Sequence, residues 1–306
     1  MALGAAVLGP RKSLAQSAGR PQRKMKLCLT PGSIGVDAGQ MEAIELAERH
    51  GFEAVEPYGG YLASLNDAQI GEVVASLQDK GLVWGAAGLP VDFRGDVEKF
   101  EHDLRDLPEI AAALQKAGAT RVGTWLRPGH DSLTYLQNLK QHAERLRQVA
   151  KVLGDHGQRL GLEYVGTHSL QSRYKYPFVH SLAETLDLIA EIGTGNVGFV
   201  LDTWHWWQAG DTADEILALA HEQVISVDLN DAPAGVPKQE QLDNQRELPA
   251  ATGVIDVRAF LSALAKIGYA GPIRPEPFNR KLNAMDNDAA CAATIKAMRT
   301  AMESVF

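Results

Sequence analysis

Residues 196–205, "NVGFVLDTWH", are followed by residues 212–222, "TADEILALAHE". The first stretch is a short apolar run, as expected of a buried parallel strand, and the second has the pattern of a helix. The apolar run ends in an acid, Asp202, and leads to His205, which stands among three of the five tryptophans of the chain. A strand and a helix in succession form the unit that α/β folds repeat.

This strand–helix unit occurs eight times from Met25 onward. Several of the helical patterns end at a glycine, such as Gly51, which is a common helix stop. Eight units predict a single-domain (β/α)8 TIM barrel. A doubly wound sheet is the alternative, but the turn after the first strand, "LTPGSIGVDAG", lacks the GxGxxG pattern. The predicted strands are 25–32, 52–60, 82–90, 119–129, 158–166, 196–205, 223–233 and 271–278, and the predicted helices are 38–51, 66–81, 96–118, 135–157, 181–193, 212–222, 256–268 and 288–305.

The composition is that of a soluble globular protein, because 45% of the 306 residues are hydrophobic and 22% are charged. The net charge of −8 and the lack of a basic stripe argue against a nucleic-acid partner. No apolar run reaches the length of a membrane span, so no membrane partner is expected. The two cysteines, Cys28 and Cys291, form neither a metal-type spacing nor a disulfide framework.

The N-terminus differs from the rest of the chain. Residues 1–10, "MALGAAVLGP", resemble the apolar region of a secretory signal, although no basic region precedes them. Residues 1–23 are therefore interpreted as a disordered leader or the remnant of a secretory signal. Residues 24–306 are assigned to the barrel. The protein is expected to be cytoplasmic, or periplasmic or secreted if the leader is a truncated signal.

Four acids stand at the C-terminal ends of consecutive predicted strands, where the side chains of a barrel meet. They are Glu163, Asp202, Asp228 and Glu276. A single strand-end acid is more often a helix cap, but four acids facing one another repel unless a cation is present. The sequence itself offers no cation to balance these four acids, so we expect a divalent metal. An all-oxygen site favours Mn²⁺ or Mg²⁺.

Aromatic side chains surround the expected mouth of the barrel. His205 stands three residues after Asp202, at the end of the sixth predicted strand, and is expected to bind a substrate oxygen. An indole face can cover the C–H face of a sugar ring. Trp204 and Trp206 are predicted to form this wall, with Trp207 in packing and Trp125 as a second wall.

Several motifs together resemble the sugar phosphate isomerase/epimerase family, the xylose-isomerase-like TIM barrels. The resemblance covers about residues 25–306. It implies the barrel fold and one divalent metal held by a Glu, an Asp, a third ligand from strand seven and a last Glu. The motifs are "GLEYVG" (161–166), "LDTWHW" (201–206), "VDLNDAPAG" (227–235), "DNQRELPAATGVID" (243–256) and "PEPF" (275–278).

Carried over residue by residue, the resemblance implies that Glu163, Asp202, Asp228 and Glu276 are the metal ligands. It also implies that Glu163 and Glu276 are the catalytic pair. One would remove a proton α to a carbonyl, and the other would return a proton to the opposite face through a metal-bound enediolate. This chain departs from the family at Asp228, where the ligand is usually His and sometimes Gln.

Two further residues match family positions that contact substrate. Arg246 corresponds to an arginine upstream of a P-x-x-x-G segment, and it would bind substrate oxygens. His168 follows strand five, where a polar substrate contact is common. The loops after strands seven and eight carry no glycine-rich phosphate nest, so the expected substrate is an unphosphorylated sugar, keto-sugar or polyol.

The leading functional hypothesis is therefore a sugar isomerase or epimerase. A lyase or dehydratase that eliminates a group β to a ketone is the alternative, because it starts with the same proton abstraction. An endonuclease is disfavoured, since the chain has neither a His-rich zinc site nor a basic face. A non-catalytic sugar-binding module would tolerate the loss of a glutamate, yet both are present. A homo-oligomer is compatible with the sequence.

Overall fold

The structure is a computed structural model that describes residues 22–306. Residues 1–21, which make up nearly all of the predicted leader 1–23, lie outside the described residues. Within the described part of the chain, no helix is both long and apolar enough to cross a membrane.

The predicted barrel is confirmed. Its sheet has the parallel order β3-β2-β1-β11-β10-β9-β7-β5-β4. The two ends of this order, β3 and β4, are neighbouring pieces of one segment, the predicted strand 82–90, so eight strand segments form a closed ring. The strands are β1 (Lys26–Leu29), β2 (Ala54–Val55), β3 (Val83–Trp84), β4 (Ala87–Gly88), β5 (Arg121–Trp125), β7 (Arg159–Glu163), β9 (Val197–Asp202), β10 (Val224–Asp228) and β11 (Pro272–Arg274).

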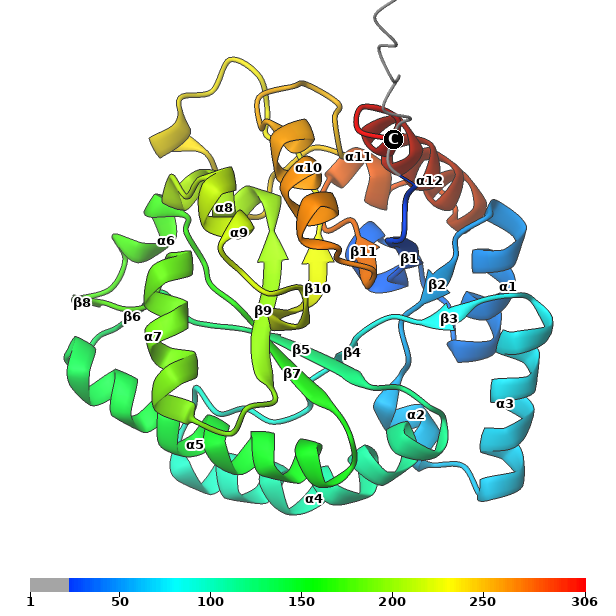
Figure 1. Cartoon of the computed structure of the whole chain (residues 1–306), viewed down its shortest axis with the longest axis horizontal. Helices are drawn as coiled ribbons and strands as arrows, with labels where there is room; N and C mark the ends of the chain where they lie inside the picture. The colour runs from blue at the N-terminus through cyan, green and yellow to red at the C-terminus, as the bar shows by residue number, and fades with distance from the viewer. Residues whose placement is uncertain (1–21) are drawn as a thin grey trace, which may run out of the picture.

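Helices lie around the outside of the strands (Figure 1). A short antiparallel pair, β6 (Gly129–His130) with β8 (Tyr176–Pro177), links two loops beside the sheet. Residues 22–306 also contain three 3₁₀ turns, η1 (Pro31–Ile34), η2 (His221–Gln223) and η3 (Lys238–Glu240). The helices are α1 (Gln40–His50), α2 (Gly59–Ala63), α3 (Asp67–Asp79), α4 (Val97–Lys116), α5 (Tyr135–Asp155), α6 (His168–Gln171), α7 (Leu182–Ile192), α8 (Thr203–Ala209), α9 (Ala213–Leu217), α10 (Val257–Ile267), α11 (Arg280–Asn283) and α12 (Asn287–Glu303).

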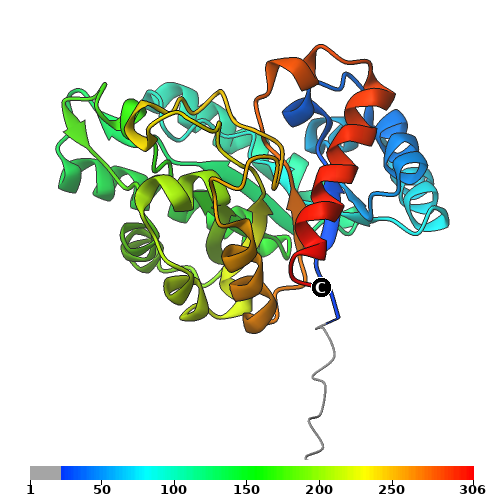
Figure 2. The same cartoon turned by 90° about the horizontal axis from the view of Figure 1, so that it is seen from above.

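The first and last parts of the barrel lie side by side. Strand β1 pairs in parallel with both β2 and β11. The last helix, α12, packs beside β1 and α1, as both views show (Figures 1 and 2). One continuous hydrophobic core joins the sheet to the surrounding helices. A single domain therefore covers the described chain from β1 to α12.

Two boundaries predicted within residues 196–222 are wrong. The strand predicted to run to residue 205 ends at Asp202, because the Asp202 carboxylate accepts the backbone N–H of Trp204 and caps α8. The helix predicted over 212–222 is α9, which ends at Leu217. The side chain of Gln223 accepts the N–H of Ala220, and the turn η2 begins there.

Strand register brings three charged side chains to one level of the barrel. Asp202 on β9 is the Cα partner of Asp228 on β10, and Asp228 is the partner of Arg274 on β11. Partners in adjacent parallel strands point to the same face of the sheet.

A close backbone approach fixes the helix that carries His205. A Cβ atom added at Gly166, in the loop after β7, would collide with the carbonyl oxygen of His205 and the amide nitrogen of Ala209. Glycine is therefore required where this loop passes α8.

Candidate functional site

The four strand-end acids meet inside the barrel mouth. Glu163, Asp202, Asp228 and Glu276 each offer one carboxylate oxygen, and these four oxygens all lie within 4.8 Å of one another. Asp202 and Asp228 are 1% and 0% exposed, and Glu163 is 7% exposed. They come from consecutive positions in the sheet order, namely β7, β9, β10 and the segment after β11. The predicted cluster of acids is thus present.

The expectation that no cation of the chain balances these acids is wrong. Two arginines, Arg246 and Arg274, lie among them. Arg246 donates from Nη1 to Asp202 Oδ2 at 2.7 Å, and Arg274 donates to both oxygens of Asp228, each at 2.7 Å. Sequence reasoning placed Arg246 here but missed Arg274. The available signal was a basic residue two positions before Glu276, on the same face of the strand.

Arg246 reaches the acids from the long segment between β10 and α10, and its side chain is 1% exposed. Nη2 donates to Asp243 Oδ1 at 2.9 Å, and Nη1 lies 3.5 Å from Glu276 Oε2. Burial opposes the charge of Arg246, but Asp202 and Asp243 outweigh it and raise the pKa of the guanidinium. Asp243 was not predicted from the sequence.

Asn230 organises the two ends of the acid cluster. Its Nδ2 donates to Asp202 Oδ1 at 3.1 Å, and its Oδ1 accepts the backbone N–H of Glu276 at 2.8 Å. The backbone N–H of Asn230 donates to Thr203 Oγ1. This residue follows β10 by two positions and was missed, because an Asn in a polar loop gives no distinctive signal.

Two glutamates of the cluster hold their protons more tightly than usual. Burial raises the pKa of Glu163 well above its ordinary value, and the charges of Glu276 and Asp228 raise it further. Burial also raises the pKa of Glu276 to about 7, although Arg274 opposes this shift. A carboxyl group with a pKa of about 7, such as Glu276, can accept and return a proton near neutral pH.

His205 lies in the same site. Its Nε2 is 3.8 Å from Glu163 Oε1 and 3.2 Å from Arg246 Nη2. Because a guanidinium only donates, Nε2 acts as the acceptor and the proton belongs on Nδ1, which faces Thr167 Oγ1 at 3.5 Å. Burial lowers the pKa of His205 and so favours the neutral ring.

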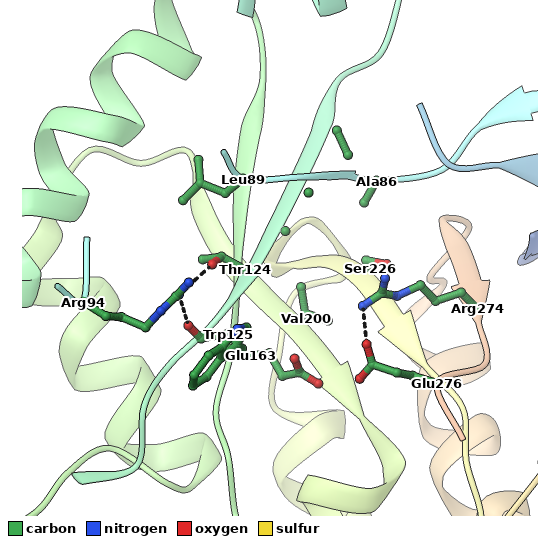
Figure 3. Close-up of a pocket in the computed structure, with 13 residues that line it drawn as sticks. Ala86, Leu89, Arg94, Thr124, Trp125, Glu163, Val200, Ser226, Arg274 and Glu276 are labelled. Atoms are coloured by element: carbon green, nitrogen blue, oxygen red, sulfur yellow. Dashed lines mark hydrogen bonds and ion pairs between the residues drawn. The ribbon is translucent and has the colours of Figure 1, made fainter. Parts of the chain in front are cut away.

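Two cavities open onto the cluster, with volumes of about 230 Å³ and 310 Å³. Glu163, Glu276 and Trp125 line both of them. Phe278 lines the larger cavity, and its backbone φ of +43° is unusual for a bulky residue. The close-up shows Glu163 and Glu276 directed into the smaller cavity, with Trp125 at its edge (Figure 3). Trp125 and Phe278 are 43% and 36% exposed and provide aromatic faces there.

The prediction that Trp204 and Trp206 form a wall of the substrate site is wrong. The Trp204 indole is fully buried and donates to Thr167 Oγ1, and Trp206 packs against Phe260 of α10. Neither lines the two cavities, because α8 begins at Thr203 and turns both indoles into the core. His168 is exposed at the start of α6 and also lies outside both linings.

The residues present fit a hard divalent cation. The donors are carboxylate oxygens, which Mg²⁺ and Mn²⁺ prefer. Oε1 of Glu163 is buried and has no hydrogen-bond partner, although buried polar atoms are normally paired. An ion bound by Glu163 would satisfy this atom.

The family model of the xylose isomerase-like TIM barrel matches residues 44–301. The chain belongs to this family. A solved member, a xylose isomerase domain protein from Alicyclobacillus acidocaldarius, shares 30% identity with a TM-score of 0.80, covering 92% of this chain and 99% of its own. A solved structure described as the IolI protein with a binding zinc atom is 19% identical, with a TM-score of 0.76, and covers 92% of this chain and 99% of its own.

Two curated relatives of this xylose isomerase-like barrel are named as an isomerase and an epimerase. An inosose isomerase from Bacillus velezensis is 23% identical over 260 residues, which cover 83% of this chain and 89% of the relative. An L-ribulose 3-epimerase from Mesorhizobium japonicum is 26% identical over 225 residues, covering 71% and 69%.

Proposed function

We propose that the chain is a divalent-metal-dependent isomerase or epimerase that acts on an unphosphorylated sugar, keto-sugar or polyol. The observation that carries this proposal is the placement of Glu163 and Glu276. Glu163 is buried and the side chain of Glu276 is 16% exposed, both line the same two cavities, and two strands carrying aspartates separate them in the sheet. The names of the two curated relatives agree with this class of reaction.

The metal is proposed to be Mn²⁺ or Mg²⁺, held by Glu163, Asp202 and Glu276, with Asp228 beside them. When bound, a divalent ion withdraws electrons from carbonyl and hydroxyl oxygens and so acidifies the neighbouring C–H group.

The protein side of the reaction is proton transfer. Glu163 accepts the proton from the carbon next to the carbonyl, and Glu276 holds a proton that it returns to the other side of the substrate. Burial raises the pKa of Glu276 to about 7, so this group can hold a proton at neutral pH and pass it to the substrate. The two roles interchange when the reaction runs in reverse.

The walls of the cavities position and enclose the substrate. Trp125 and Phe278 cover the C–H faces of the sugar, and Arg246 and His205 meet its oxygens. The loops after β10 and β11 carry no glycine-rich phosphate nest, which supports an unphosphorylated substrate.

The test is a proton-exchange screen in D₂O. The protein loaded with Mn²⁺ is incubated with a panel of keto-sugars and followed by ¹H NMR. We expect the signal of the C–H next to the carbonyl to fade as the isomeric sugar appears. Elimination products without an isomer would support the lyase alternative, and neither exchange nor product with any sugar would contradict both.

A matched control variant shows whether a loss of exchange is specific to the site. Glu98→Gln changes an exposed glutamate in the first turn of α4 and should exchange at the wild-type rate. Glu163→Gln should show little or no exchange.

A further inference from the structure

Asp228 is bound to Arg274 through two parallel hydrogen bonds. Nε of Arg274 donates to Oδ1 and Nη2 donates to Oδ2, each at 2.7 Å. This two-point contact between a guanidinium and a carboxylate is the strongest geometry for such a pair. Since Asp228 is 0% exposed, the contact is also shielded from water.

The sheet itself builds this pair. Asp228 and Arg274 are register partners on the adjacent strands β10 and β11. Their side chains therefore start from the same level and point to the same face. Separating them would leave a carboxylate and a guanidinium unpaired in the interior, which is strongly unfavourable.

Asp202 also contacts an arginine, but in a different way. Arg246 comes from the long segment between β10 and α10 and gives Asp202 one hydrogen bond. It shares its other donors with Asp243 and the Glu276 carbonyl. The other donors to the Asp202 carboxylate are neutral, namely Asn230 Nδ2 and the backbone N–H of Trp204, so its charge is paired by a single contact from a loop residue. The charge of Asp228 is instead paired at both oxygens by a guanidinium that the neighbouring strand holds in place.

The cavity lining separates the two members of the pair. Arg274 lines the smaller cavity and its side chain is 23% exposed, whereas Asp228, like Asp202, lies behind that lining. The guanidinium lies at the cavity beside Glu276, and its Nη2 is 3.3 Å from Glu276 Oε1 (Figure 3). A ligand in the cavity thus meets Arg274 before it meets Asp228.

We infer that Asp228 does not coordinate the metal, but holds Arg274 in place as a positioning residue. The ion is then bound by three carboxylates, from Glu163, Asp202 and Glu276. The remaining positions are left to water and substrate, as is usual for Mg²⁺. This inference rests on the metal centre proposed above. The positive charge of Arg274 is then fixed beside Asp228, the position at which the family pattern has a further ligand.

The direct test is the anomalous diffraction of crystals soaked in MnCl₂. We expect one manganese peak, with oxygens of Glu163, Asp202 and Glu276 at about 2–2.5 Å. The two hydrogen bonds from Arg274 to Asp228 should stay intact. A peak at bonding distance from an Asp228 oxygen, with Arg274 displaced, would overturn this ligand set and leave the proposed metal centre standing.

Substitutions test the same point in solution, with Mn²⁺ dissociation constants measured by EPR. Arg274→Met removes a like charge and frees Asp228, so it should tighten Mn²⁺ binding by about 10- to 100-fold. Asp228→Asn leaves Arg274 unpaired beside the ion and should weaken binding by a similar factor. The double variant removes a neutral pair and should bind Mn²⁺ within about threefold of wild type.

Arg258→Met is the control, because it removes one arginine from the exposed surface of α10. It should leave the Mn²⁺ affinity unchanged. A double variant that has lost Mn²⁺ binding, or an Arg274→Met variant with wild-type affinity, would overturn the inference. Absence of Mn²⁺ from wild type and from every variant would overturn the metal centre together with its ligand set.

Discussion

Asp202 and Arg246 form a buried ion pair, with 2.7 Å between Oδ2 and Nη1 and side chains that are 0% and 1% exposed. The pair joins the end of β9 to the long segment that follows β10. Asp202 also caps α8, so the same carboxylate ties together a strand, a helix and a loop. Removal of one partner from such a pair leaves an uncompensated charge in the interior.

The first prediction concerns this ion pair. Arg246→Met should lower the free energy of unfolding by about 3–5 kcal/mol, because Asp202 and Asp243 lose their cation. Urea denaturation measures the change, with Arg258→Met as the surface control. Adding Mn²⁺ should recover part of the loss. A loss of under about 1 kcal/mol would show that the acids do not depend on Arg246 for their balance.

Removal of metal should destabilise the protein. A ligand at 100 times its dissociation constant stabilises the folded state by about 2.7 kcal/mol. The melting temperature should therefore fall after treatment with EDTA and rise again with Mn²⁺. The double variant Glu163→Gln, Glu276→Gln should lack this response. Identical melting curves of wild type with and without Mn²⁺ would refute a metal centre.

The stability of the metal-free protein should depend on pH in a defined direction. Burial raises the pKa of Glu276 from 4.5 to about 7, so the folded state binds a proton that the unfolded state has released. Between these two pH values the free energy of unfolding should fall as pH rises, by up to about 3 kcal/mol. Unfolding of wild type and Glu276→Gln at pH 5 and pH 8 isolates this contribution. With saturating Mn²⁺ the slope should weaken or reverse, because the ion competes with the proton. An equal pH dependence in both proteins would contradict the shift.

The aromatic residues should separate binding from folding. Trp125→Ala and Phe278→Ala remove exposed cavity walls and should raise KM with little change in kcat. Trp204→Ala empties a fully buried site and should instead lower the free energy of unfolding by about 3–5 kcal/mol. Steady-state kinetics and urea denaturation of the three variants measure both effects. A raised KM in Trp204→Ala at unchanged stability would restore the predicted tryptophan wall.

The barrel could be predicted from the sequence because each unit carries its own local signals. The run Val197–Asp202 is fully buried, as a parallel strand surrounded by helices must be. The boundary at Thr203 could not be predicted from hydrophobicity, since Trp204, Trp206 and Trp207 follow it closely. What ends the strand is the side chain of Asp202, which caps the next helix.

The candidate site was predictable where strand ends alone determine position. Glu163, Asp202, Asp228 and Glu276 meet because consecutive parallel strands end at the same mouth. The side chains that pair with these acids were harder to predict. The position of Arg274 two residues before Glu276 was a local signal, but its pairing with Asp228 depends on the register between β10 and β11, which no local pattern reveals.

The central claim is that Glu163 and Glu276 exchange protons with the substrate, and single-turnover deuterium exchange tests it most directly. Glu163→Gln and Glu276→Gln, each loaded with Mn²⁺, are compared with wild type on the most active keto-sugar in D₂O. We predict that each substitution lowers kcat by about 10²–10⁴-fold, with a much smaller change in KM. One of the two variants should still exchange the substrate's C–H without forming product. Near-native kcat in either variant, with Mn²⁺ bound, would contradict the two-glutamate mechanism.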